Sequence, residues 1–186
     1  MTPTIEQLET RDAPGTIGLD LSGLGSMFQR DRAFDFVPGR RGSRLRINAR
    51  DLEECRREIT TRVQEYFPGW SVVRGAGSVN VYVGGSLAGE PNVIGRATPA
   101  QPGRNAAGPA FVFTDTIWAH YGGFRPRPTQ LAQWIATVTA HEIGHLLGLP
   151  HEDGTVMSAI HNPFTLRPSW SAAQIREING SLNQES

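Results

Sequence analysis

The sequence has little cysteine and no long apolar run, and both shortages limit what the protein can be. Cys55 is the only cysteine among 186 residues, which excludes an intramolecular disulfide framework. No stretch approaches the roughly 18 apolar residues that a transmembrane helix needs, and no charged-then-apolar segment opens the chain. We therefore expect no membrane span, while the sequence itself leaves the compartment open.

The chain also has no excess of charge of either sign. The chain has 18 basic and 18 acidic residues, which give a formal net charge of zero. Such a balance provides no general attraction to nucleic acid or to an anionic surface. The locally basic segment 40–46 alternates after Ser43 in the way of a strand with one solvated face. We expect no nucleic-acid partner.

The length is that of one domain with a sizeable core. Residues 1–15 have the composition of a flexible tail, and residues 16–186 are expected to form a single domain. An amphipathic helix is predicted over Asp51–Phe67, ended by Pro68-Gly69, with Cys55 on its buried face. Strands are predicted at 16–22, 44–48 and 78–83, glycine-rich connections at 23–42 and 84–91, and a long loop at 99–109.

The segment His141–His151, HEIGHLLGLPH, holds three of the five histidines. In a helix, His141 and His145 would project from one face one turn apart, so both could reach one metal ion. Gly148 can adopt the left-handed conformation that ends a helix, which would let His151 approach from another direction. The spacing therefore predicts a metal site with three imidazole ligands.

The helix that carries this motif is predicted from about Thr129 to Leu147, and its apolar face leads directly into the site. Glu142 is offset from the first ligand, so it can hold a water molecule without binding the metal, which is the position of a general base. Three protein ligands leave a fourth position open, as in hydrolytic zinc sites. We expect one catalytic Zn²⁺ whose bound water has a pKa of about 7, with Glu142 taking the proton.

With the following segment GTVMS at 154–158, the motif resembles that of the metzincin clan of zinc endopeptidases, most closely the matrixin branch. The resemblance implies an α/β (α+β zincin) fold, in which a twisted mixed sheet has a backing helix and an active-site helix. A small irregular C-terminal subdomain would contain a Met-turn and a final helix. The resemblance implies the ligands His141, His145 and His151, the base Glu142 and the supporting Met-turn residue Met157.

The same resemblance covers most of the chain. It divides the catalytic domain into an N-subdomain of about 16–148 and a C-subdomain of about 149–186. Segments 92–97 and 108–115 look like the family's edge strand and the strand after it, and 170–178 looks like its final helix, with Ser171 as N-cap. Residues 158–170 would wall the primed-side pocket. A substrate would pair with the edge strand, which implies contacts from Ile94, Gly95, Arg96 and Ala97.

Some positions depart from the matrixin pattern. Met157 follows His151 more closely than in matrixins, and Glu152 stands where matrixins usually carry serine. The upstream strands lack the histidines of a matrixin-type structural zinc, so we expect a single zinc ion. No ligand set predicts calcium, although Asp115 leaves such a site open.

Four candidate residues lie outside the metal motif: Asp12, Cys55, His120 and His161. A cysteine switch is not expected, because Cys55 falls inside a predicted helix. Asp12 could approach the zinc as a carboxylate, but short tails of this kind are usually solvated. His120 is expected in a solvated loop, and neither it nor His161 has a ligand partner at suitable spacing. Resemblance to the family favours action outside the cytoplasm.

The sequence thus predicts a monomeric zinc endopeptidase that hydrolyses peptide or protein substrates. One alternative keeps the two helical histidines but takes a distant glutamate such as Glu177 as third ligand; His151 and Met157 argue against it. Another alternative is a zinc-stabilised binding module or pseudoenzyme without turnover. The intact Glu142 argues against that reading, because a structural site has no use for a base.

Overall fold

The computed structural model describes residues 15–24, 49–98, 108–121, 126–159 and 168–182. The expected N-terminal tail before Gly15, the expected strand at 44–48 and most of the loops at 23–42 and 99–109 lie outside these residues. So do Asp12, His161 and much of the segment expected to wall the primed-side pocket.

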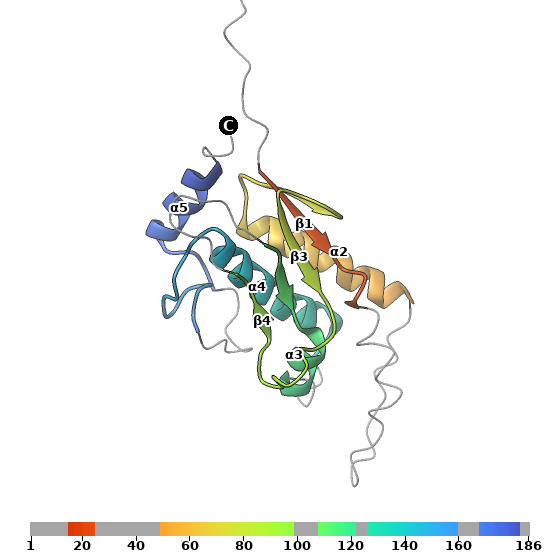
Figure 1. The fold of residues 1–186 in the computed structure, drawn as a ribbon. Helices are drawn as coiled ribbons and strands as arrows, with labels where there is room; N and C mark the ends of the chain where they lie inside the picture. Colours follow the sequence, from red (N-terminus) through yellow and green to blue (C-terminus); the bar gives the residue numbers. More distant parts are fainter. Residues whose placement is uncertain (1–14, 25–48, 99–107, 122–125, 160–167, 183–186) are drawn as a thin grey trace, which may run out of the picture.

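Five strands form one mixed sheet in the order β2-β1-β3-β5-β4 (Figure 1). All neighbouring pairs are parallel except β4 with β5, which is antiparallel. The expected mixed sheet is confirmed, and segment 92–97 does supply an edge strand, although only two of its residues are in β4. The strands are β1 Thr16–Asp20, β2 Ser71–Arg74, β3 Val79–Val83, β4 Gly95–Arg96 and β5 Ala110–Val112.

Four helices are present in the described part of the chain: α2 Ala49–Tyr66, α3 Thr114–Tyr121, α4 Pro128–Leu146 and α5 Ala172–Leu182. The two long helices, α2 and α4, lie on the same side of the sheet and pack extensively against each other (Figure 1). They agree with the two helices expected at Asp51–Phe67 and Thr129–Leu147. None of these helices has the combination of length and apolar character that crossing a membrane requires.

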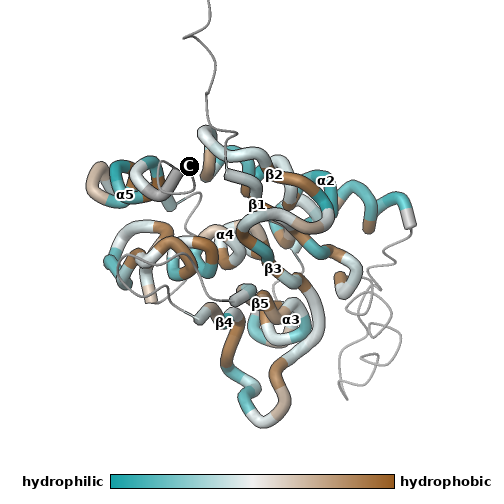
Figure 2. The backbone as a smooth tube through the Cα atoms, turned by 45° about the horizontal axis from the view of Figure 1, so that its top comes forward, coloured by the Kyte–Doolittle hydropathy of each residue, from teal (hydrophilic) through white to brown (hydrophobic). Residues whose placement is uncertain are grey.

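The core lies between the sheet and these two helices. The residues that are buried follow the periodicity of the strand or helix to which they belong. In β3, Val79, Val81 and Val83 are buried while Tyr82 between them is exposed, as the alternation of a strand requires. Hydrophilic and hydrophobic stretches alternate along α2 (Figure 2). This helix buries side chains at every fourth position, which places one stripe against the core: Cys55, Ile59 and Val63.

A short crossover connection passes over β1. Strands β2 and β3 flank β1 on opposite sides and run parallel to it, yet only residues 75–78 join them. This connection passes so close to β1 that a Cβ on Gly77 would lie 2.5 Å from the carbonyl oxygen of Thr16 and 2.5 Å from the nitrogen of Gly18. The crossing therefore requires glycine at position 77.

Two sequence-based expectations were incomplete or wrong. Strand β2 was not predicted, because its four residues follow immediately after the turn that ends α2. Segment 108–115 was expected to be one strand, but β5 ends at Val112 and α3 starts at Thr114. Asp115 lies in the first turn of α3, where a carboxylate interacts favourably with the helix dipole. His120 is consequently an exposed residue in the last turn of α3, not part of a loop.

Candidate metal centre

Helix α4 delivers the two helical histidines from a firmly packed element. Pro128 stands at its start, and the N–H of Arg127 donates to Oε1 of Gln130 at 2.9 Å, which closes the first turn. Almost every residue from Ile135 to Gly144 is buried. The last turns of α4 carry His141, Glu142 and His145. Packing of α4 in the core therefore holds these turns in place without a bound ligand.

The helix ends in the way the sequence predicted. Gly148 has a φ of 87°, and its N–H donates to the carbonyl of His145 at 3.0 Å. The N–H of Leu149 donates to the carbonyl of Gly144 at 2.9 Å. These two bonds form a Schellman motif, which needs a left-handed residue after the helix. The motif reverses the chain and brings His151 back toward α4.

The three imidazoles converge on one point. Nε2 of His145 lies 3.1 Å from Nε2 of His141 and 3.1 Å from Nε2 of His151. One possible ligand atom from each residue lies within 4.8 Å of the others, and no other group of three or more candidate ligands occurs in the described ranges. His141 is buried, His145 is half-buried and His151 is exposed, so the cluster opens to solvent on the side of His151.

The hydrogen bonds of two histidines fix where their lone pairs point. Nδ1 of His141 lies 2.9 Å from the carbonyl oxygen of Val156, and Nδ1 of His145 lies 3.0 Å from that of Leu149. A carbonyl oxygen only accepts, so each Nδ1 donates a proton and each Nε2 of the neutral ring presents a lone pair. Such lone pairs repel at 3.1 Å unless a proton or cation lies between them.

This donor set fits a zinc ion. Tetrahedral zinc at 2.0–2.1 Å from each imidazole nitrogen would separate those nitrogens by about 3.3–3.4 Å. The observed 3.1 Å is close to that spacing. Donation from Nδ1 to a main-chain carbonyl is also the usual way in which proteins orient metal-binding histidines. The three-histidine group can therefore hold a metal ion such as zinc.

The side chain of Glu142 extends from α4 toward the edge strand β4. The residue is 5% exposed, and burial raises its pKa from 4.5 to about 7. A cation bound at the neighbouring histidines would act in the opposite direction. A Cβ on Gly95 would lie 2.7 Å from Cδ and 2.9 Å from Cγ of Glu142, so the absence of a side chain on β4 makes room for the carboxylate.

The four residues expected to bind substrate lie at this edge. Gly95 and Arg96 pair with β5 along one side of β4, and in the described sheet no strand pairs with the other side. Arg96 points to solvent and forms an ion pair with Glu90 at 3.0 Å. Ile94 and Ala97 are half-buried and pack against the core. Contact of these four residues with a substrate stays a prediction.

Met157 lies beneath the helix, fully buried. Its thioether occupies the space beside Gly144, where a Cβ would contact Sδ and would lie 3.2 Å from Cε. The turn before it is closed by the N–H of Glu152, which donates to the carbonyl of Met157 at 3.0 Å. Gly154, with a φ of 78°, permits this tight turn. That this turn is a Met-turn and that Met157 supports the metal site stay predictions.

The C-terminal segment makes contacts that the sequence did not predict. Ser171 caps α5 as expected, because its Oγ accepts from the N–H of Gln174 at 3.3 Å. Its hydroxyl also lies 3.1 Å from Oε2 of Glu152. Trp170 donates from Nε1 to the carbonyl of Tyr66 at 2.7 Å, which ties this segment to the end of α2. The sequence contains the capping pattern but gives no signal for these distant partners.

Neither the comparison with protein-family models nor that with curated protein sequences finds a match for this chain. Assignment of a function therefore depends on the residues themselves.

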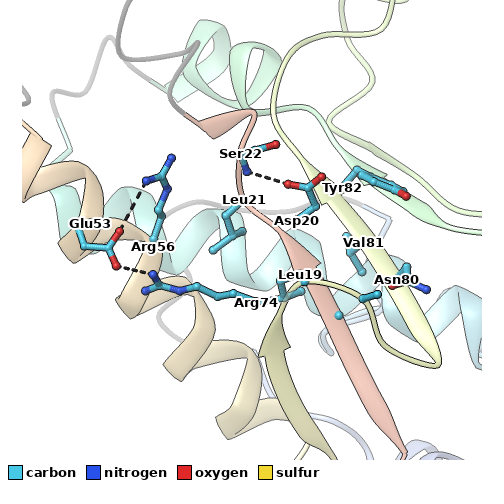
Figure 3. Close-up of a pocket in the computed structure, with 13 residues that line it drawn as sticks. Leu19, Asp20, Leu21, Ser22, Glu53, Arg56, Arg74, Asn80, Val81 and Tyr82 are labelled. Atoms are coloured by element: carbon cyan, nitrogen blue, oxygen red, sulfur yellow. Dashed lines mark hydrogen bonds and ion pairs between the residues drawn. The ribbon is translucent and has the colours of Figure 1, made fainter.

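A cavity of about 470 Å³ lies apart from the histidines, none of which lines it (Figure 3). It is formed by the ends of β1 and β2, the start of α2 and part of β3. Glu53 lies between two arginines there, paired with Arg74 and at 3.6 Å from Arg56. No histidine or cysteine lines the cavity, so it offers no set of metal ligands comparable to the histidine cluster.

Proposed function

We propose that the chain is a zinc-dependent endopeptidase in which His141, His145 and His151 hold the metal and Glu142 is the general base. One observation carries the proposal: three Nε2 atoms converge at the end of α4 that also carries the buried Glu142, while two of the rings donate their Nδ1 protons to main-chain carbonyls. A purely structural site would not need the carboxylate, and it is usually closed by a fourth protein ligand.

The chemistry follows from the positions of the side chains. Zinc in this position would polarise the scissile carbonyl and lower the pKa of a water molecule. Glu142 would accept the proton of that water and deliver it to the leaving amine. Its placement against Gly95 keeps the carboxylate next to the edge of the sheet, where a substrate would have to lie.

We propose that the substrate binds as an extended strand along β4. The support is that β4 is the edge strand of the described sheet and adjoins the candidate base. Strand addition satisfies the main-chain groups of a peptide whatever its sequence. Extended or loop segments of proteins are then the favoured substrates, and compact folded regions are not.

We also propose that residues 16–186 form one metzincin-like catalytic domain, most like the matrixin branch. The mixed sheet, the packed pair α2 and α4, and the C-terminal helix α5 support this assignment. All of these elements were expected from the resemblance of the sequence to that clan.

The test is cleavage of a quenched-peptide library by the zinc-loaded protein, with cut sites mapped by mass spectrometry. Glu142→Gln keeps the volume next to Gly95 but removes the base, and chelation removes the metal; both should abolish the cuts. Glu177→Ala on α5 serves as a matched control and should cleave like the wild type. Undiminished cleavage by Glu142→Gln would refute the mechanism. A folded, zinc-bound wild type that makes no cuts would favour a binding module.

A further inference from the structure

The peptide units around Val156 connect the buried ligand His141 to the C-terminal segment. The carbonyl of Val156 accepts from Nδ1 of His141 at 2.9 Å, and its N–H donates to the carbonyl of Ser169 at 3.2 Å. Val156 is fully buried. The ring orientation and the tautomer of His141 therefore depend on where the turn around Val156 is held.

The hydroxyl of Thr155, the preceding residue, is the centre of this turn. It donates to the carbonyl of Glu152 at 2.7 Å and accepts from the N–H of Met157 at 3.1 Å. It also accepts from Nε2 of Gln174 at 3.2 Å. A hydroxyl has one proton and two lone pairs, so these three bonds use its full capacity. The bond from Gln174 is the one that reaches the turn from α5.

Gln174 has two functions that can be separated. Its Oε1 accepts from the N–H of Ser171 at 3.0 Å, which completes the cap of α5. Its Nε2 donates to Thr155. The side chain is 3% exposed, so losing the Thr155 partner would leave a buried polar group unpaired. A glutamate in its place could still complete the cap but could not donate to Thr155.

We propose that Gln174 is a positioning residue for His141, acting through Thr155 and Val156, and that α5 thereby sets the metal affinity of the centre. The inference rests on the proposed zinc centre and deepens it. Gln174 touches neither metal nor substrate; it holds the turn whose carbonyl fixes the Nδ1 proton of His141. The free energy of metal binding would thus depend on the position of α5.

The first measurement is zinc affinity, by competition with a chromogenic chelator. Gln174→Glu and Thr155→Val should each weaken binding measurably, by less than the roughly 10- to 100-fold lost when a direct hydrogen-bond partner of a metal ligand is removed. Thr155→Ser keeps the hydroxyl and should bind like the wild type. In the Thr155→Val background, Gln174→Glu should add little further loss, because both changes break the same contact.

The second measurement needs no metal. Long-range ¹H–¹⁵N spectra of the metal-free protein report which ring nitrogen of each histidine is protonated. Compared with the wild type, Gln174→Glu should increase the fraction of His141 rings that carry the proton on Nε2 instead of Nδ1. His145 is an internal control, because its Nδ1 is held by Leu149, which has no part in the turn around Thr155.

Two further variants separate positioning from general stability. Arg176→Ala changes the exposed face of α5, and Ile59→Val loosens the core at α2; neither should change zinc affinity or the His141 tautomer. Unchanged affinity and tautomer in Gln174→Glu would overturn the inference and leave Gln174 as a helix cap only. A tautomer change without zinc binding by the wild type would support the positioning role while refuting the proposed function.

Discussion

Gly95 of the edge strand β4 lies directly against the carboxylate of Glu142 on α4. A Cβ at position 95 would lie 2.7 Å from Cδ of Glu142 and 2.9 Å from its Cγ. Glu142 is only 5% exposed, so its side chain is packed against protein and not free in solvent. The edge strand therefore fixes the position of the candidate base in addition to forming the border of the sheet.

Gly95→Ala should reduce hydrolysis while leaving the metal site intact. The added methyl group would displace the carboxylate of Glu142, and a misplacement of about 1 Å can cost roughly 100-fold in rate. We expect kcat/KM to fall by about that factor, with zinc content unchanged. Gly108→Ala, at a glycine with no atom within 4 Å of the added Cβ, is the matched control. Equal kcat/KM in both variants would contradict this relation.

Gly144→Ala should destabilise the protein, although alanine ordinarily favours a helix. Its Cβ would collide with the thioether of Met157 and lie 3.4 Å from Cη2 of Trp170. Overpacking of this kind costs about 1–3 kcal/mol. Gly180→Ala, at an open position in α5, should instead stabilise by about 0.5–1 kcal/mol. Urea denaturation in excess chelator measures both; a stabilising Gly144→Ala would show that Met157 moves aside freely.

Zinc should stabilise the folded chain through His151. A ligand at 100 times its Kd adds about 2.7 kcal/mol to the free energy of unfolding, and chelation should remove this gain. His151→Ala should greatly reduce it at the same zinc concentration while changing the chelated protein little, because this side chain is exposed. His120→Ala on α3 should retain the full gain. A zinc effect that survives His151→Ala would favour another third ligand.

Cys55 should be unreactive in the folded protein. The side chain is 1% exposed, and burial raises the pKa of its thiol from 9.0 to about 12. At pH 8 a disulfide reagent should label the native protein at least about 100-fold more slowly than the urea-unfolded protein. Rapid native labelling would contradict the burial of Cys55 and reopen the possibility of a cysteine-based block of the metal.

The same thiol gives stability a defined pH dependence. Its pKa is raised in the folded state, so its contribution is fully present below pH 9 and is lost as the pH rises toward 12. In that range the unfolded chain releases a proton that the native chain keeps. Cys55→Ala should therefore flatten the decline of unfolding free energy above pH 9. An unchanged slope would show that other groups cause the decline.

Local sequence signals predicted the parts of the fold that local chemistry decides. The run of buried residues in α4, the spacing of His141 and His145 and the left-handed Gly148 all act within a few positions of one another. For the same reason Pro68-Gly69 correctly marked the end of α2, and Ser171 correctly marked the start of α5. These features depend mainly on residues that are close together in the sequence, so they can be predicted without knowledge of the tertiary structure.

The missed features depend on contacts between distant segments. Strand β2 is too short to show a pattern of its own and exists because it pairs with β1. Helix α3 begins where β5 stops, and the N–H of Asp115 donates to the carbonyl of Gly85 at 2.9 Å, a partner thirty residues earlier in the chain. The bond from Gln174 to Thr155 likewise spans 19 positions. A window of about 11–18 residues, over which sequence periodicity is judged, does not contain both members of any of these pairs.

The close crossing of Gly77 over β1 has a consequence for how the molecule can assemble. Strands β2 and β3 pair with β1 from opposite sides, so neither the connection between them nor this half of the sheet has its native packing without β1. The pairing joins residues more than fifty positions apart, which slows folding. A fragment that begins after Asp20 would lack the strand around which the sheet is built. Helix α4, which carries the candidate ligands His141 and His145, could not then be isolated together with an intact sheet.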